Sequence, residues 1–257
     1  MGLHLNSLFD RFLHRRSINR WSEAAQLAEE ADLGTLKALR IQAREMRRRV
    51  DKLLHVAEGR LALPLIGSTA IQKPLHSDWA YRPTIWRGPM EPRGLAAVEN
   101  KTMIGDEAQI FHDCAVTELT VRQLRNAREE DLAPFGLRMD VFRFDGSFLS
   151  LVLELPEDSV EGLKRRHIVR LQTIVETEKP LEIFARLNIK HGPNTEQIVR
   201  ELPLNEEEVM VEFDLAYTKM NEKRVDRMWV DLIFEGPEMN QIILRDIAFS
   251  RRPRAEI

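Results

Sequence analysis

Cysteine is almost absent from this chain: Cys114 is the single one among 257 residues. A lone thiol cannot close an internal disulfide, so the composition excludes a disulfide-stapled domain and favours a reducing cytoplasmic compartment. No apolar run approaches the roughly 20 residues that a membrane-spanning helix needs. Charges at Asp10 and Arg11 also interrupt any apolar core that a secretory signal would need near the beginning.

A strong excess of charge of one sign is missing as well. The net charge is −3, which argues against a general nucleic-acid binder, so no nucleic-acid partner is expected. The charge is unevenly spread, because residues 1–60 carry 12 Lys and Arg against 8 Asp and Glu, which leaves −7 for the rest of the chain. The N-terminal part is therefore expected to be a separate element.

Signatures of the common enzyme classes are not found. The sequence has no phosphate-binding loop, dinucleotide fingerprint, zinc-spaced Cys/His set or nucleophile elbow. His112 and Cys114 share one face of an expected strand, but no third ligand or orienting partner accompanies them, and Cys114 is interpreted as a small apolar residue. No catalytic residue, metal site or cofactor is predicted. A glycoside-active enzyme stays a third hypothesis, which would need two facing carboxylates.

Residues 1–58 are predicted to be helical, beginning with a basic amphipathic helix over 3–16. Its apolar stripe is followed by Arg15 and Arg16. Such a helix either contacts an anionic membrane surface peripherally or packs on a neighbouring helix, and the packing alternative is favoured. A second short helix is expected over 21–32.

A heptad pattern begins at Leu36. Apolar residues follow at spacings of 3, 4, 3, 4, 3 and 4, at Leu36, Leu39, Ala43, Met46, Val50, Leu53 and Ala57. This register predicts a helix over 36–57 that pairs with another helix. The partner is either the segment 21–32, in an antiparallel helical hairpin, or a protein partner or second copy in a coiled coil. The hairpin is favoured, and the arginines are interpreted as a solvated face.

Residues 59–95 contain five of the twelve prolines and two of the four tryptophans. Proline excludes a helix or a central strand, and the rings argue against disorder, so the segment is predicted to be an extended strap. Either its rings fasten it to the next domain, or Trp79, Tyr81 and Trp86 form a ligand platform. The first alternative is favoured.

Residues 96–257 alternate apolar and polar side chains in short runs separated by turn signals, which predicts a mainly β domain, an antiparallel jelly-roll β-sandwich. Asp145-Gly146 lies between two such runs, 137–144 and 148–155, and predicts a tight hairpin with a positive φ at Gly146. A short helical piece is expected around 125–133. The expected strands lie near 96–103, 107–112, 115–124, 137–144, 148–155, 166–177, 181–190, 196–204, 208–217, 228–235 and 240–250.

One face of these strands combines an aromatic ring with planar polar groups. If the apolar residues face the core, the side chains that point outward are those of Glu154, Arg170, Gln172, Arg186, Asn188, Lys190, Glu212, Asp214, Trp229 and Asp231. The ring stacks on sugar C–H faces and the polar groups bond hydroxyls, so a polysaccharide ligand is predicted. The alternative is an ordinary solvated surface. The predicted ligand-binding residues are Trp229, Asp231, Arg186 and Asn188, with Asp145 and His191 at loop ends and Trp79 and Trp86 from the strap.

Several blocks carry a family resemblance. They are Glu99-Asn100, 111–114 (FHDC), 122–126 (RQLRN), 144–150 (FDGSFLS) and 249–254 (FSRRPR). Over about residues 60–257 the chain resembles a family of alphaproteobacterial proteins that is known as a domain of unknown function, which implies a bacterial origin and carries over no functional residues. The strand order is also similar to galactose-binding-like jelly rolls used as carbohydrate-binding modules. Together these observations favour a non-enzymatic module for cell-envelope polysaccharide over a scaffold that recruits a protein or membrane through its N-terminal helices.

Overall fold

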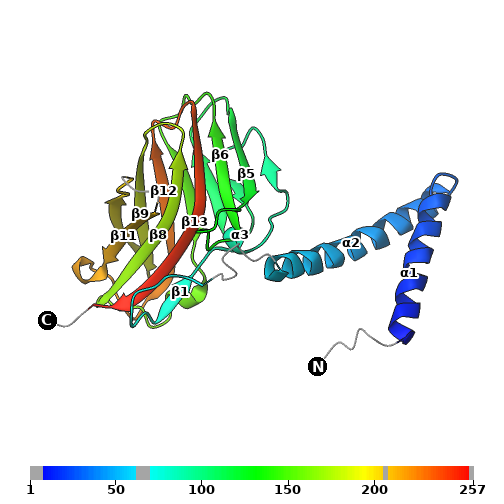
Figure 1. Cartoon of the computed structure of the whole chain (residues 1–257), viewed down its shortest axis with the longest axis horizontal. Coiled ribbons are helices and arrows are strands. Elements are labelled where there is room, and N and C mark those ends of the chain that lie inside the picture. The colour runs from blue at the N-terminus through cyan, green and yellow to red at the C-terminus, as the bar shows by residue number, and fades with distance from the viewer. Residues whose placement is uncertain (1–7, 62–69, 205–207, 255–257) are drawn as a thin grey trace. The chain divides into compact units, whose positions relative to one another are not determined.

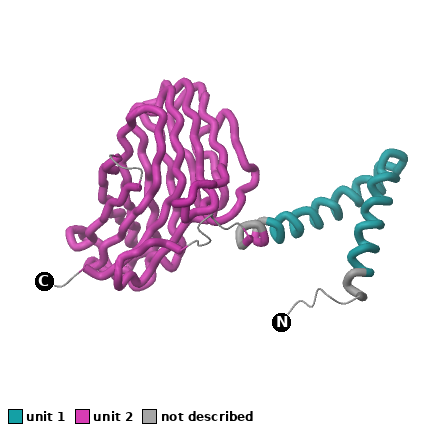
Figure 2. The backbone as a smooth tube through the Cα atoms, in the orientation of Figure 1, with its two compact units in different colours: residues 1–54 teal, residues 55–257 magenta. Residues whose placement is uncertain are grey.

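The computed structural model describes residues 8–61, 70–204 and 208–254. Its chain divides into two compact units, residues 1–54 and 55–257, coloured teal and magenta in Figure 2. The first unit is helical and the second is built from two antiparallel β-sheets. The predicted mainly β fold with N-terminal helices is therefore confirmed. None of the described helices is long and apolar enough to cross a membrane.

From Leu8 on, where the structure describes it, the first unit contains two helices, whereas the sequence predicts three. Helix α1 runs over Leu8–Leu27 and α2 over Leu33–Leu61, so the helices predicted at 3–16 and 21–32 are largely one helix. Asp32 begins α2, since its carboxylate accepts hydrogen bonds from the backbone N–H groups of Gly34 and Thr35, at 2.9 and 3.0 Å. The apolar residues predicted before Leu8 lie outside the described residues.

Most of the heptad stripe of α2 is not buried: Leu36 and Leu39 next to the α1–α2 turn are half-buried, but the stripe from Ala43 to Leu53 is exposed. Met46, Val50 and Leu53 keep 45%, 43% and 67% of their surface exposed. The predicted burial of the whole stripe within a hairpin is therefore wrong for the part from Ala43 to Leu53. The regular spacing had indicated a helical partner without indicating which one.

The second unit is a jelly roll (Figure 1). Strands β6 to β13 alternate between the sheets except at the β9–β10 hairpin, which gives the orders β11-β8-β13-β6 and β10-β9-β12-β7. Short N-terminal strands extend both sheets, and β1 pairs with β13. Sheet 1 contains β1 (Trp79–Tyr81), β2 (Gly94–Leu95), β5 (Leu119–Arg125), β6 (Phe135–Val141), β8 (His167–Thr177), β11 (Glu208–Asp214) and β13 (Asn240–Pro253). Sheet 2 contains β3 (Thr102–Ile104), β4 (Ala108–His112), β7 (Leu149–Glu154), β9 (Glu182–His191), β10 (Asn194–Glu201) and β12 (Val225–Glu235).

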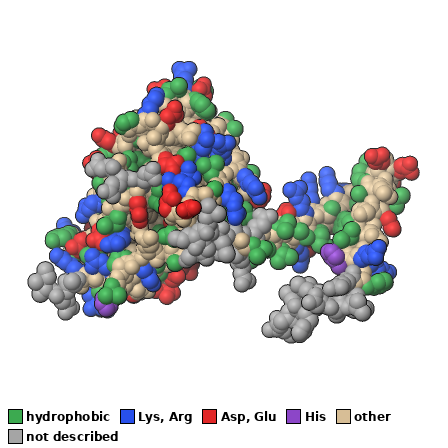
Figure 3. Space-filling model, viewed as in Figure 1, with side chains coloured by type: hydrophobic (Ala, Val, Ile, Leu, Met, Phe, Trp, Pro, Cys, Tyr) green, Lys and Arg blue, Asp and Glu red, His purple; other side chains and the backbone are tan. Residues whose placement is uncertain are grey.

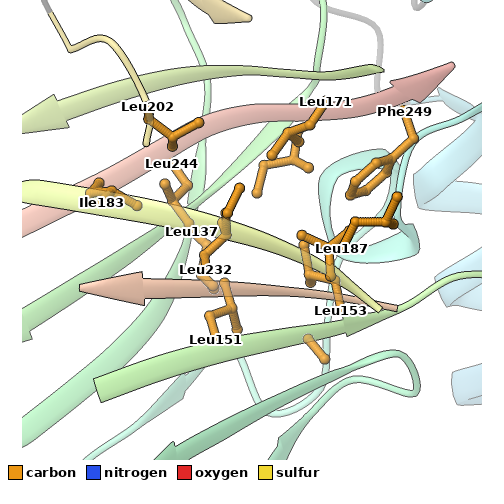
Figure 4. Close-up of a cluster of buried hydrophobic side chains, with 14 of the residues drawn as sticks. Leu137, Leu151, Leu153, Leu171, Ile183, Leu187, Leu202, Leu232, Leu244 and Phe249 are labelled. Atoms are coloured by element: carbon orange, nitrogen blue, oxygen red, sulfur yellow. The ribbon is translucent and has the colours of Figure 1, made fainter. Parts of the chain in front are cut away.

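The core lies between the sheets and follows from the period-2 pattern. Leu151 and Leu153 of β7 and Leu232 of β12 are completely buried, whereas the residues between them on each strand face outward. Figure 4 shows these side chains among others contributed by strands of both sheets, including Leu137, Leu171 and Phe249. This alternation fixes which polar side chains are presented on the outer faces.

The Asp145-Gly146 turn is not a tight hairpin. Strand β6 pairs with β5 and β13 in sheet 1, and β7 pairs with β12 and β4 in sheet 2, so the turn carries the chain from one sheet to the other. Gly146 has no positive φ. It is needed for space, because a Cβ there would lie 2.6 Å from Asp113 Oδ1 and 2.9 Å from Cys114 Sγ. Both strands were predicted, but their pairing was not.

The strap is fastened to the sandwich. Strand β1 extends sheet 1, and the short helix α3 (Thr84–Arg87) buries Ile85 and Trp86 in the core. Arg82, 2% exposed, forms a two-pronged ion pair with Asp246 at 2.8 and 2.7 Å. Burial raises the pKa of Asp246, and the hydrogen bonds from Arg82 oppose that rise.

Two local predictions are wrong. Residues 126–134 contain no helix; instead Asn126 donates from Nδ2 to the carbonyls of Ala133 and Arg245, at 2.9 and 2.8 Å, and holds an irregular loop. The strand expected at 96–103 is interrupted, since Ala97 and Lys101 have positive φ. In both places, side-chain bonds or turn geometry outweigh the local pattern.

Candidate ligand-binding face

The outer face of sheet 2 gathers side chains in rows that follow the strand register. Trp229 of β12 lies between Asn188 of β9 and Glu154 of β7. In the next row Asp231 lies between Arg186 and Val152. A third row contains Ile233, Ser150 and Phe111. Since residues two apart on a strand are about 6.7 Å apart, the three rows extend over roughly 13 Å.

A hydrogen-bonded network fixes the polar centre of this face. Asp231 Oδ2 accepts from Arg186 Nε at 2.7 Å and from Asn188 Nδ2 at 3.1 Å, and Arg186 Nη2 lies 2.6 Å away. Asn188 Oδ1 in turn accepts from Gln197 Nε2 of β10 at 2.9 Å. Asp231 and Asn188 are buried, whereas the Arg186 side chain keeps 36% of its surface exposed. The network therefore holds the guanidinium in place while part of it faces solvent.

Trp229 is half-buried and lies beside a second pair of charges. The Arg227 guanidinium carbon lies 4.6 Å from the centre of the Trp229 ring, a cation–π contact, and its Nη1 is 3.5 Å from Glu154 Oε1. Burial raises the pKa of Glu154 above its ordinary value, with the charge of Arg227 opposing and that of Asp231 adding to the rise. The ring and its flanking charges form the edge of the face nearest Asn188.

These residues line a hollow of about 560 Å³, whose other side is apolar. Phe111, Phe148, Val152 and Ile233 contribute to that side, and Phe148 is 41% exposed. The volume falls within the range of roughly 300–1,000 Å³ that is typical of small-ligand sites. We call the residues that line it the candidate face: Gln109, Phe111, Phe148, Ser150, Val152, Glu154, Arg186, Arg227, Trp229, Asp231 and Ile233.

Four predicted site residues come together here. Trp229, Asp231 and Arg186 line the hollow, and Asn188 bonds to Asp231 next to it. His191 does not join them, since it points inward at the end of β9, is 5% exposed and accepts at Nδ1 from the Asn221 N–H. Asp145 is exposed in the β6–β7 turn, where Oδ1 accepts from the Ala115 N–H, and it does not line the hollow.

Trp79 and Trp86 do not form a ligand platform. Trp86 is 0% exposed and donates from Nε1 to the Leu244 carbonyl at 2.9 Å. Trp79 is 8% exposed and donates to Asp158 Oδ1. Both belong to the strap on sheet 1, so the alternative that the rings fasten the strap is confirmed, and their predicted ligand-binding role is wrong because no ring face is available.

Several residues of the face were not predicted. Arg227 was missed because it precedes the apolar alternation of β12, and Phe148 because it was assigned to the hairpin strand. Phe111 and Gln109 sit on β4, whose neighbour β7 is far away in sequence. Only the register between strands distant in sequence places these residues together, and no local pattern contains that information.

The expected polar residues of other strands lie on the opposite side of the sandwich. Arg170 and Gln172 of β8 and Glu212 of β11 are on sheet 1, where Arg170 Nε donates to Glu212 Oε1 at 3.0 Å. Figure 3 shows acidic and basic side chains interspersed over the side of the sandwich turned to the viewer. This surface, on which oppositely charged side chains pair with each other, resembles an ordinary solvated face and is separate from the hollow.

His112 and Cys114 are structural. His112 Nε2 lies 2.9 Å from the Val98 carbonyl, and its Nδ1 accepts from the Cys114 N–H at 3.2 Å, so both ring nitrogens are engaged. Burial raises the pKa of the Cys114 thiol, which disfavours a thiolate nucleophile. Within the described residues, no group of three or more His, Cys, Asp and Glu side chains could hold a metal ion.

A model of a protein family, described as "Family of unknown function (DUF6478)", matches residues 1–257. The chain belongs to this family. The match includes the helical unit as well as the sandwich, whereas the resemblance seen in the sequence blocks covered about residues 60–257. No curated protein sequence matches this family member.

Several solved structures match this family member at low identity. A bacteriophage CBA120 tailspike protein 4 domain is 8% identical, with a TM-score of 0.40, over 56% of this chain and only 19% of the tailspike chain. A family 11 carbohydrate-binding module of a Clostridium thermocellum cellulase is 10% identical (TM-score 0.39) over 62% of this chain and 94% of the module. A xylan-binding CBM22-1 domain from Paenibacillus barcinonensis is 8% identical (TM-score 0.37) over 72% of this chain and 100% of the domain.

Proposed function

We propose that the candidate face binds a glycan and does not cleave it. The observation that carries the proposal is the half-buried Trp229 ring next to the Arg186–Asp231–Asn188 network in one hollow. A sugar presents C–H-rich faces to an aromatic ring and hydroxyls to planar polar groups, so the two features suit the same ligand. Because the network is already formed, binding needs little ordering of these side chains.

The apolar side of the hollow extends the contact surface. Phe148 and Val152 line the same hollow as Trp229. Neighbouring rows of side chains on the strands are about 6.7 Å apart, and this spacing is close to the size of one sugar ring. A chain of sugars lying along the strands would place one ring on Trp229 and the next near these apolar side chains. The face therefore favours an oligosaccharide over a free monosaccharide.

The state of the carboxylates supports binding without cleavage. A glycosidase needs one carboxyl group as acid and a second as nucleophile or base, aimed at the scissile bond from opposite sides. Asp231 is buried and bonded to Arg186 and Asn188, and Glu154 lies on the same sheet beside it. The two carboxylates therefore share one side of the hollow, which suits hydroxyl recognition.

Titration calorimetry of the intact chain against bacterial envelope and capsular polysaccharides tests the proposal. We expect saturable binding to at least one of them, and Trp229→Ala should weaken it by about tenfold or more, which is about 1.4 kcal/mol or more. Trp21→Ala, the same change in the helical unit, is the matched control and should bind normally. Absence of binding to every polysaccharide, or equal binding by both variants, would contradict the proposal.

A reducing-end assay separates binding from hydrolysis. The polysaccharide that binds should release no new reducing ends on prolonged incubation. If ends appear and Glu154→Gln stops their release, the face is catalytic and the non-enzymatic assignment is wrong.

A further inference from the structure

Helix α2 presents an unusual surface for a helix of a single chain. Its heptad positions are largely uncovered, with Met46, Val50 and Leu53 each more than 40% exposed. Basic side chains accompany the stripe: residues 36–57 contain seven Lys and Arg and two acidic residues. Figure 3 shows apolar and basic side chains next to each other along the helices. Exposed apolar surface of this extent indicates an interaction site.

The spacing of the stripe identifies the kind of partner. Alternating steps of 3 and 4 over Leu36–Ala57 give a period of 3.5 residues, which matches a second helix in a coiled coil, whereas a straight helix drifts by about 20° per heptad from such a repeat. The stripe contains no aromatic residue, and two of its positions, Ala43 and Ala57, are small. Helices that lie on membranes present Trp and Phe besides Leu, and the stripe contains neither aromatic residue. The stripe therefore fits a helix better than a lipid surface.

The flanking charges are compatible with a second copy of α2 as that helix. Arg47 and Arg49 flank the stripe, and each is bonded within its own helix, Arg47 Nε to Asp51 at 3.2 Å and Arg49 Nη2 to Glu45 at 2.8 Å. These internal pairs compensate the charges that would otherwise repel across a seam between identical helices. The stripe can thus pair with itself in spite of the basic composition.

The same positions favour a parallel arrangement. In a parallel, in-register pair, the residue just before a first heptad position faces, on the other copy, the residue just after the next fourth position. Gln42, before Ala43, therefore faces Arg47, and Arg49, before Val50, faces Leu54 of the other copy. No like charges meet. An antiparallel pair centred on the stripe would bring the two Arg47 side chains together. Leucine at Leu39 and Leu53, with the β-branched Val50, is typical of two-stranded coils.

We propose that two copies of the chain associate through a parallel coiled coil over residues 36–57. The association presents two sandwiches on one assembly. Pairing itself does not depend on glycan binding; if the candidate face binds a repeating polysaccharide, two linked faces would gain avidity.

Light scattering on the intact chain tests the pairing. The expected mass is twice the 29.9 kDa of one chain. Met46→Glu places a charge in the seam and should give a monomer with an intact sandwich, judged from its thermal unfolding. Ile41→Glu is the matched control, because Ile41 is 58% exposed on the opposite side of α2, and it should remain dimeric. A monomeric wild type, or a dimer that Met46→Glu leaves intact, would overturn the proposal.

Disulfide trapping tests the orientation. In a Cys114→Ser background, Val50→Cys should crosslink two copies under mild oxidation, because a parallel seam brings the two positions together. Arg48→Cys, on the outer side, should crosslink much less. Equal crosslinking would contradict the parallel arrangement. A monomer that sediments with phosphatidylglycerol vesicles, and loses this with Met46→Glu, would assign the stripe to an anionic lipid surface instead.

Discussion

Arg186 and Asp231 are paired across β9 and β12, with Arg186 Nη2 2.6 Å and Nε 2.7 Å from the same carboxylate oxygen, Oδ2. Asp231 is 3% exposed, so its charge depends on Arg186 and Asn188 for compensation. The exposed part of the guanidinium is thereby directed at the hollow next to Trp229. The pair serves both the stability of sheet 2 and the polarity of the candidate face.

Asp231→Ala should reduce the free energy of unfolding by about 2 kcal/mol, because the Arg186 guanidinium loses this acceptor and the buried Asn188 amide keeps only its bond to the Arg186 carbonyl. Arg227→Ala removes the exposed ion pair between Arg227 of β12 and Glu154 of β7 and should cost less than about 1 kcal/mol. Urea unfolding of both variants measures the difference. Equal losses would mean that Asp231 does not hold the network.

Replacing the buried Trp86 should destabilise the chain more than replacing the half-exposed Trp229. Trp86→Ala should destabilise the chain by about 3–5 kcal/mol, since it opens a cavity in the core and frees the Leu244 carbonyl. Trp229→Ala should cost about 1 kcal/mol in stability, since one side of the ring is already exposed. Thermal unfolding of each variant checks this order, and a larger loss for Trp229→Ala would show that Trp229 is a core residue and not a contact residue.

The sequence predicts the strands of this fold well, because the alternation of apolar and polar side chains can be recognised from neighbouring residues alone. The predicted strands 148–155 and 228–235 match β7 and β12 closely, and their inward leucines are those of the core. Strand pairing is a different matter. Asp145-Gly146 has the composition of a hairpin turn, but β6 pairs with β13 and β7 pairs with β12. These partners lie about 100 and 80 residues further along the chain, because the burial of both inner faces outweighs the preference of the local turn.

The candidate site was predictable in part for the same reason. Alternation alone places Trp229 and Asp231 on the outer side of β12, and Arg186 and Asn188 on that of β9. Their proximity follows from pairing of the two strands, which the sequence suggested only through composition. Burial of Trp79 and Trp86 could not be distinguished from exposure, since it depends on how the strap crosses sheet 1.

Gly146→Ala should destabilise the turn between the sheets by about 1–3 kcal/mol, because the added Cβ meets Asp113 Oδ1 and Cys114 Sγ and forces the backbone to move. Gly94→Ala is a suitable comparison, as the nearest atom to its Cβ is 3.5 Å away. Chemical denaturation of both variants measures the cost. A neutral Gly146→Ala would mean that the turn adapts freely.

Stability should depend on pH through Glu176. Its hydrogen bond with Arg245, followed by the charges of Arg245 and Arg128, holds the pKa of Glu176 below its ordinary value of 4.5 despite partial burial. A carboxyl group whose pKa is lower in the folded state than in the unfolded state stabilises the folded protein at pH values above the unfolded-state pKa. This stabilisation is lost as the pH falls through the folded-state pKa.

Glu176→Gln should therefore cost about 1 kcal/mol at neutral pH, a small figure because the pair is partly exposed. The difference from wild type should shrink as pH falls below 4.5. Glu235→Gln, at an exposed strand end, should show no such trend. Unfolding free energies measured between neutral and acidic pH test this, and a constant difference would contradict the role of the ion pair.

Indole NMR tests the proposed glycan-binding role of the candidate face most directly. The chain contains four tryptophans, Trp21, Trp79, Trp86 and Trp229, so four indole N–H signals report on the helical unit, the strap and the face. Adding the best-binding polysaccharide fragment should shift the Trp229 signal in a saturable way and leave those of Trp79 and Trp86 in place. A glycan that binds without moving the Trp229 signal, or moves the strap signals instead, would contradict binding at this face.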